Sequence, residues 1–96
     1  MMLIPNLNLV FKFEKSIKFL TKSIDLGFIE DNYIERGRSY QQLGDFENAL
    51  INFNLSIKLN KFNYRANINK AIVLFKLNKF ENAKKLNKNL TIEEYY

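Results

Sequence analysis

The sequence of 96 residues contains no cysteine and no histidine. Without these residues the chain can form no disulfide bond, no thiolate nucleophile, no imidazole general base and no zinc site of the Cys/His kind. One proline and three glycines offer few points at which the chain can turn. A fold of many short strands is therefore disfavoured, and long helices are favoured.

Long apolar runs are also missing. The longest, AIVLF, covers residues 71–75, whereas a helix that spans a bilayer needs about 20 apolar residues. The first residues, MMLIPNLNLVF, are apolar, but they lack a basic segment and a cleavage site of small residues. They therefore do not resemble a signal peptide. We expect a cytoplasmic protein that makes no contact with a membrane.

The net charge of +5 is unevenly distributed. Residues 64–96 contain seven basic and three acidic residues. Residues 1–29 contain four basic and two acidic residues, and residues 30–63 contain four basic and five acidic residues. A basic C-terminal third could bind nucleic acid weakly. Because the whole chain is rich in asparagine and lysine, this excess can also reflect composition alone, so nucleic-acid binding remains an alternative hypothesis.

Apolar residues recur at helical spacing along most of the chain. Phe13, Ile17, Leu20 and Ile24 are three or four residues apart, which predicts an amphipathic helix. The same spacing predicts four further helices. The five predicted helices cover residues 13–26, 31–43, 46–59, 64–77 and 80–90.

Residues between these segments are suited to helix ends. Gly27 and Gly44 follow the first two predicted helices, where glycine readily adopts the left-handed conformation that ends a helix. Asp45 can accept hydrogen bonds from the first N–H groups of the third helix. Asn78 takes the place of glycine after the fourth helix. Lys79 cannot cap the fifth helix and opposes its dipole, so this helix is predicted to be the weakest.

The chain also repeats itself. FEKSIKFLTKSIDL, residues 13–26, corresponds to FENALINFNLSIKL, residues 46–59, when Phe13 is aligned with Phe46. NYRANINKAIVLFKLNKFENA, residues 63–83, then restates the preceding helix and turn, with Phe80 in the place of Phe46. A recurring period of about 34 residues is typical of helical repeat proteins.

The middle copy of the repeat covers residues 32–60. It resembles a tetratricopeptide repeat (TPR), because its aromatic and small residues stand at the spacing of that family. The resemblance implies a right-handed stack of antiparallel helix pairs, an all-α α-solenoid fragment of about two and a half repeats. We expect residues 1–96 to form a single domain. The resemblance implies that residues 10–31 form the second helix of a truncated repeat, residues 32–63 a complete repeat and residues 64–96 a divergent repeat. The pattern residues are Tyr33, Gly37, Tyr40, Gly44, Phe46, Ala49 and Phe53.

Gly37 is unusual because it lies inside a predicted helix, where glycine costs about 1 kcal/mol relative to alanine. A partner helix too close for a methyl group would explain it. Ala71 occupies the corresponding position in the next copy. We therefore expect alanine at position 37 to cost little, and leucine at least about 2 kcal/mol.

The resemblance implies a protein–protein interaction module whose first helices line a concave groove. The corresponding positions combine apolar residues with arginine and lysine, which suits a peptide that carries an acidic residue or a free carboxylate. An ordinary solvated helix face is the alternative. The predicted groove residues are Ile34, Glu35, Arg38, Gln41, Gln42, Arg65, Ile68, Asn69, Ile72, Phe75 and Lys76.

Two narrower functions are not expected. TPR domains that clamp the C-terminus of heat-shock chaperones use lysine and asparagine in three successive first helices, and only Asn69 matches that set. For an enzyme, Asp31 with Glu35 lies at a helix start and Glu93 with Glu94 near the end of the sequence, with no phosphate loop, nucleophile elbow or metal-ligand spacing. We therefore expect no catalysis, no metal and no cofactor.

Self-association is a further hypothesis. Repeat arrays need neighbours on both sides and a polar capping helix at the end. Here the last residues are apolar, and no capping helix is predicted after them. We therefore expect the ends to be covered by a second copy, as in a homo-oligomer or scaffold, or by another protein. The apolar residues concerned are Leu86, Leu90, Ile92, Tyr95 and Tyr96.

Overall fold

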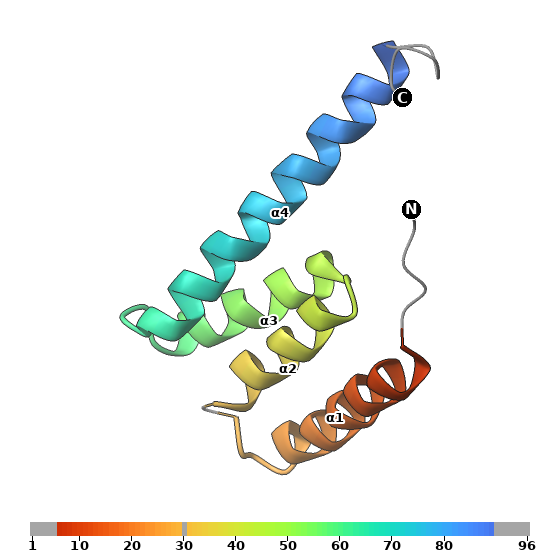
Figure 1. Ribbon diagram of the computed structural model, residues 1–96. Helices are drawn as coiled ribbons and strands as arrows, with labels where there is room; N and C mark the ends of the chain where they lie inside the picture. Colours follow the sequence, from red (N-terminus) through yellow and green to blue (C-terminus); the bar gives the residue numbers. More distant parts are fainter. Residues whose placement is uncertain (1–5, 30, 90–96) are drawn as a thin grey trace.

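The structure is a computed structural model that describes residues 6–29 and 31–89, with residues 83–89 described by their backbone alone. In these ranges it contains four α-helices and no strand (Figure 1). The predicted all-α class is confirmed, but the number of helices is four instead of five. The helices are α1 (Leu7–Asp25), α2 (Asn32–Gln42), α3 (Phe46–Leu59) and α4 (Tyr64–Asn89).

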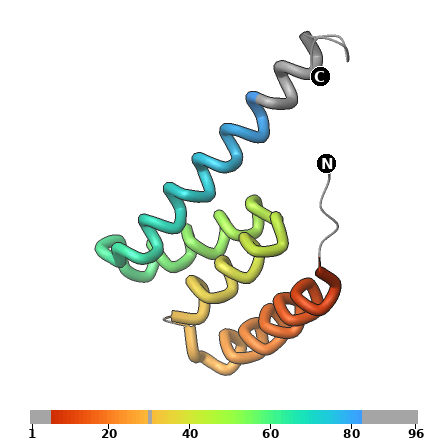
Figure 2. The backbone as a smooth tube through the Cα atoms, in the orientation of Figure 1, coloured from red at the N-terminus to blue at the C-terminus, as the bar shows by residue number. Residues whose placement is uncertain are grey.

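Consecutive helices run antiparallel and pack side by side (Figure 2). The path of the chain leads from α1 to α2, α3 and α4, and α2 also contacts α4. The helical hairpin of α2 and α3 therefore lies in the middle, with α1 on one side and α4 on the other.

The first helix begins earlier than predicted, at Leu7 instead of Phe13. Asn6 is its N-cap, and its side-chain Oδ1 accepts a hydrogen bond of 2.9 Å from the backbone N–H of Asn8. Asparagine is among the best N-cap residues, which explains why the helix extends to this position. Phe13, Ile17, Leu20 and Ile24 are all partly buried, as the amphipathic pattern predicts.

Gly27 and Gly44 end α1 and α2 as predicted, with φ angles of +98° and +79°. At the second of these ends, the N–H of Gly44 donates to the carbonyl of Gln41 and the N–H of Asp45 donates to the carbonyl of Tyr40. This pair of bonds is the Schellman motif, which satisfies carbonyls that would otherwise lack a partner.

The predicted cap of α3 is also confirmed. Asp45 Oδ1 accepts from the N–H of Asn48 at 3.2 Å, and its Oδ2 accepts from the side-chain amide of Asn48 at 2.7 Å. Because Asp45 directly follows Gly44, one helix end and the next helix start are encoded by two adjacent residues.

The prediction of a turn at Asn78 was wrong. The fourth and fifth predicted helices are one continuous helix, α4, and no described residue other than glycine has a positive φ. The left-handed conformation costs asparagine more than glycine, and Lys79 supplies no N-cap bond to offset that cost. Its 26 residues span about 39 Å at 1.5 Å per residue, so α4 extends well past the end of α3 (Figure 1).

The core lies where α2, α3 and α4 meet. Five residues there have no exposed surface, whereas α1 contributes no fully buried residue. The stability of the fold therefore depends mainly on the last three helices, with α1 packed against their outer side. The buried apolar residues are Ile34 from α2, Ala49 and Phe53 from α3, and Ala66 and Val73 from α4.

Candidate peptide-binding surface

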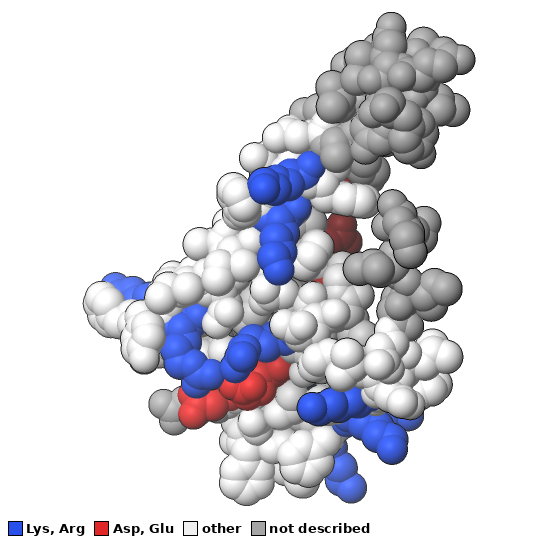
Figure 3. Space-filling view, viewed as in Figure 1, with Lys and Arg blue, Asp and Glu red and all other residues white. Residues whose placement is uncertain are grey.

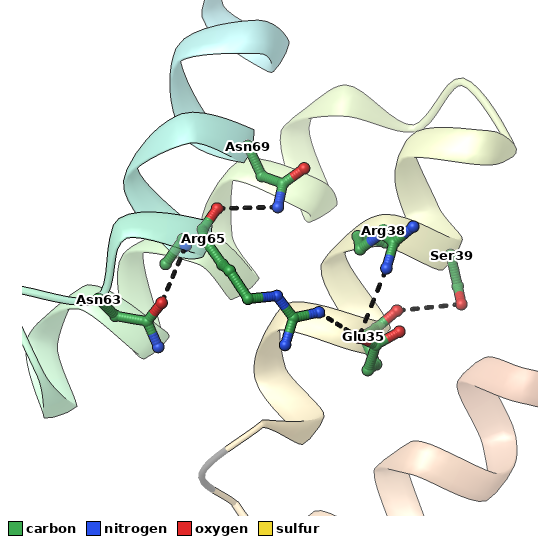
Figure 4. Close-up of polar contacts among 7 residues, drawn as sticks. Glu35, Arg38, Ser39, Asn63, Arg65 and Asn69 are labelled. Atoms are coloured by element: carbon green, nitrogen blue, oxygen red, sulfur yellow. Dashed lines mark hydrogen bonds and ion pairs between the residues drawn. The ribbon is translucent and has the colours of Figure 1, made fainter.

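An ion pair joins α2 to the first turn of α4 at the centre of the predicted groove. Arg65 Nη2 donates to Glu35 Oε1 at 2.8 Å, and Arg38 Nη1 lies 3.6 Å from the same oxygen (Figure 4). The three side chains are 40% to 53% exposed. Their combined charge is +1, because one carboxylate is shared by two guanidinium groups.

Neighbouring polar residues hold the backbone around this ion pair. The N–H of Ala66 donates to Asn63 Oδ1 at 3.2 Å, which caps the turn that carries Arg65. One turn later, Asn69 Nδ2 donates to the carbonyl of Arg65 at 2.8 Å (Figure 4). On α2, Ser39 Oγ donates to the carbonyl of Glu35 at 3.1 Å. The ion pair is thus built on two regular helix segments.

An apolar stripe on α4 begins one turn after Arg65. Ile68, Ile72 and Phe75 follow at spacings of four and three residues, which places them on one side of the helix. All three are exposed. The ammonium group of Lys79 lies 4.8 Å from the ring centroid of Phe75, a cation–π contact at the far end of the stripe.

Not every predicted groove residue lies on this surface. Ile34 is completely buried and belongs to the core. The ammonium group of Lys76 lies 5.9 Å from the ring of Phe46, so this side chain is directed toward α3. Gln41 is partly buried, and Gln42 lines a hollow between α1 and α2. The structure thus brings together Glu35, Arg38, Arg65 and Asn69, with Ile68, Ile72 and Phe75 beside them.

Arg36 connects three helices, a role that the sequence analysis missed. Its Nε donates to Asn52 Oδ1 in α3 at 2.6 Å, and its Nη1 donates to Thr21 Oγ1 in α1 at 3.1 Å. Its guanidinium also lies 5.6 Å from the ring centroid of Tyr33. The sequence contained one indication of this role: Arg36 directly precedes Gly37, so it lies beside the point where α2 and α3 cross.

Basic side chains are dispersed on the face of the molecule shown in Figure 3, where Lys and Arg atoms form separate groups and one group borders acidic atoms. This face therefore has no continuous basic surface. Lys84, Lys85 and Lys88 belong to the basic C-terminal third, but their side chains lie outside the described residues, as do those of Leu86, Leu90, Ile92 and the final tyrosines.

The described part of the chain contains neither a candidate metal site nor a candidate membrane span. Within it, no three His, Cys, Asp or Glu side chains are grouped so that they could hold a metal ion. None of its four helices combines the length and apolar character that a membrane span requires.

The family comparison agrees with the hairpin in the middle of the fold. A family model described as tetratricopeptide repeat matches residues 30–63, which include all of α2 and α3. The comparisons with curated proteins and with solved structures gave no match. A repeat of this family suggests an interaction or scaffold role among proteins. Residues 30–63, which include α2 and α3, thus correspond to one repeat of the TPR type.

Proposed function

We propose that α2 and α4 together bind a peptide segment of another protein. The observation that carries the proposal is the exposed stripe of Ile68, Ile72 and Phe75, which starts one turn from the ion pair of Glu35 and Arg65. Apolar side chains at this spacing can accommodate one or two apolar side chains of a peptide, while the charged end orients it.

The ion pair limits how strongly the surface selects acidic peptides. Glu35 already neutralises part of the charge of Arg38 and Arg65. A carboxylate of the peptide must compete with Glu35 for these guanidinium groups, so its contribution is smaller than that of two free arginines. A short stripe with few anchors gives micromolar affinity, roughly −8 kcal/mol.

The test selects peptides from a display library on the intact protein and measures their affinity for purified variants. Phe75→Ala should weaken binding at low and at high salt, because it removes apolar contact area. Replacing both Arg38 and Arg65 by alanine should weaken binding mainly at low salt, because salt screens exposed charges. Leu59→Ala is the control, since this exposed leucine lies at the end of α3.

Selected peptides that bind the Phe75 variant and the double arginine variant as tightly as the original protein would contradict the proposal. If the Leu59→Ala control alone lost affinity, the binding surface would lie on α3 instead. A selection that yields no peptide with micromolar affinity would likewise exclude this surface as a peptide site.

A further inference from the structure

The internal repeat relates the two outer helices to the central hairpin. Aligning Phe13 with Phe46 makes α1 correspond to α3, and aligning Gly37 with Ala71 makes α2 correspond to α4. The contact of α2 with α3 and α4 therefore has a counterpart at each end of the molecule. The α1 end has the counterpart of the site that receives α2, and the α4 end has the counterpart of α2 itself.

Within the chain, α2 packs into the angle between α3 and α4. Ile34 is the central residue of this contact, and it is buried with Ala49, Phe53 and Val73. Asn52 of α3, which accepts the hydrogen bond from α2, is only 3% exposed.

The counterpart of this angle, between α1 and α2, is an open cleft. Two adjoining hollows of about 400 and 380 Å³ form it, and both are lined by Ser16, Glu35 and Ser39. Ser16 corresponds to Ala49, and Ser39 corresponds to Val73. The cleft thus has the same place in the repeat as the site that receives Ile34.

Phe19 shows that this cleft lacks the helix that its counterpart has. Phe19 lines the cleft and corresponds to Asn52 of α3. Whereas Asn52 is 3% exposed, Phe19 is 72% exposed. The difference arises because α2 covers α3 at Asn52, while none of the described helices covers α1 at Phe19.

The face that would fit the cleft is exposed at the other end of the molecule, on α4. Ile68 corresponds to Ile34, and it is 56% exposed where Ile34 is completely buried. Ala71 corresponds to Gly37 and Leu74 to Tyr40, and both Ala71 and Leu74 are exposed. Helix α4 therefore displays the residues by which α2 packs against α3.

We propose that α4 of a second copy of this chain docks in the cleft between α1 and α2, with Ile68 in the position that Ile34 has within one chain. We choose a second copy as the occupant because the two surfaces correspond to the two sides of one contact within the chain. The cleft corresponds to the site between α3 and α4, and the exposed face of α4 corresponds to the face of α2 that packs there. A chain cannot fill its own cleft in this way, because α2 and α3 separate α1 from α4 (Figure 1).

Two further features affect this contact, one favourably and one unfavourably. Lys70 of α4 corresponds to Arg36, so Lys70 of the second copy would lie beside Phe19, where it can form a cation–π contact. Ser16 and Ser39 make the cleft more polar than the site that holds Ile34, so the association is weaker than the intrachain packing. Docking shares Ile68 and the cleft residue Glu35 with the proposed peptide surface but leaves Ile72 and Phe75 unused, so Phe75→Ala tests peptide binding separately from self-association.

The contact joins two different surfaces, so each added copy leaves one cleft and one docking face open. Such heterologous association produces a series of oligomers or a ring instead of a symmetric dimer. Sedimentation velocity of the full chain over a range of concentrations should therefore show dimers, trimers and larger species that increase together with concentration.

Two single variants and their mixture test the contact directly. Phe19→Lys places a charge in the cleft opposite Lys70, and Leu74→Lys places one on the docking face. Each variant alone should sediment as a monomer. Mixed in equal amounts they should form a heterodimer and nothing larger, because the intact cleft of one variant still accepts the intact α4 of the other.

Ile51→Lys is the matched control. Ile51 lies on α3 and is 55% exposed, and its counterpart on α1 is already lysine, Lys18. This variant has the same charge as the other two and should keep the full series of oligomers. Circular dichroism of each variant should show the helix content of the original protein, because lysine is a good helix former.

Three results would overturn the proposal. The first is an original protein that stays monomeric up to millimolar concentration. The second is a single symmetric dimer, and the third is a pair of monomeric variants whose mixture also stays monomeric. A milder change, Ile68→Ala, should raise the dissociation constant about tenfold, and an unchanged constant would equally contradict this register.

Discussion

A methyl group on Gly37 would lie 2.6 Å from Cε1 of the Phe53 ring, and 2.9 and 3.0 Å from its Cδ1 and Cζ atoms. Phe53 is completely buried in the core, so its ring has little room to move. The two helices of the matched repeat cross at this point, as the sequence predicts. Ala71, the counterpart of Gly37, is exposed, so it is no evidence that alanine fits at position 37.

We expect Gly37→Ala to lower the free energy of unfolding by about 1–3 kcal/mol because of overpacking. The structure thus revises the sequence-based expectation of a small effect. This loss is the net effect that remains after the gain of about 1 kcal/mol that alanine brings in helix propensity. Urea denaturation measures the change. Adding Phe53→Leu to the alanine variant should recover part of the loss, and an alanine variant more stable than the original protein would contradict the close approach.

Arg36 and Asn52 should behave as a coupled pair. Arg36→Ala leaves the Oδ1 atom of Asn52 without its donor, and this buried group then costs about 1–3 kcal/mol. Replacing both residues by alanine should cost less than the sum of the two single changes, with a coupling of at least about 0.5 kcal/mol. Arg38→Ala is the control and should change stability by less than about 1 kcal/mol. Additive single effects would show that the hydrogen bond contributes nothing.

Glu35→Gln should change the affinity for an acidic peptide while leaving the stability of the fold nearly the same. The ion pairs of Glu35 are largely exposed, so their loss should change the free energy of unfolding by less than about 1 kcal/mol. The same change frees Arg38 and Arg65 and should strengthen the binding of an acidic peptide, most clearly at low salt. Fluorescence titration with a glutamate-containing peptide measures the affinity, and Glu47→Gln, in the first turn of α3, is the control. Equal affinities for both variants would show that the arginines do not contact the peptide.

The continuity of α4 should depend on residues 78 and 79. The double change Asn78→Gly and Lys79→Asp introduces the pair that ends α2 and begins α3 at Gly44 and Asp45. We expect it to break α4 there, because glycine lowers the cost of the left-handed conformation and aspartate supplies a cap. Carbon-13 chemical shifts of residues 76–81 report the change. Helical shifts retained in the double variant would mean that packing against α3 holds α4 straight.

Much of the fold follows from signals within a few residues of one another. Apolar spacing predicts the helices, and the pair of Gly44 and Asp45 determines where α2 ends and α3 begins. These signals succeed because a left-handed glycine and an N-cap act on the hydrogen bonds of their own turn. Gly37 adds one tertiary fact, the helix crossing, since a glycine inside a helix is costly unless a neighbour requires it.

By itself, the sequence thus determines an all-α repeat protein, the place of its central hairpin and the residue at which two helices cross. Only the tertiary structure decides that Ile34 is buried and that Arg36 joins three helices. It also decides that Glu35 forms ion pairs with both arginines of the predicted groove. Glu35 and Arg65 are 30 residues apart and Arg36 and Asn52 are 16 apart, so their contacts depend on how whole helices pack. The same reason applies to α4: Asn78 resembles a turn residue locally, but a turn there forms only if its cost is offset by a cap or by a helix that packs back.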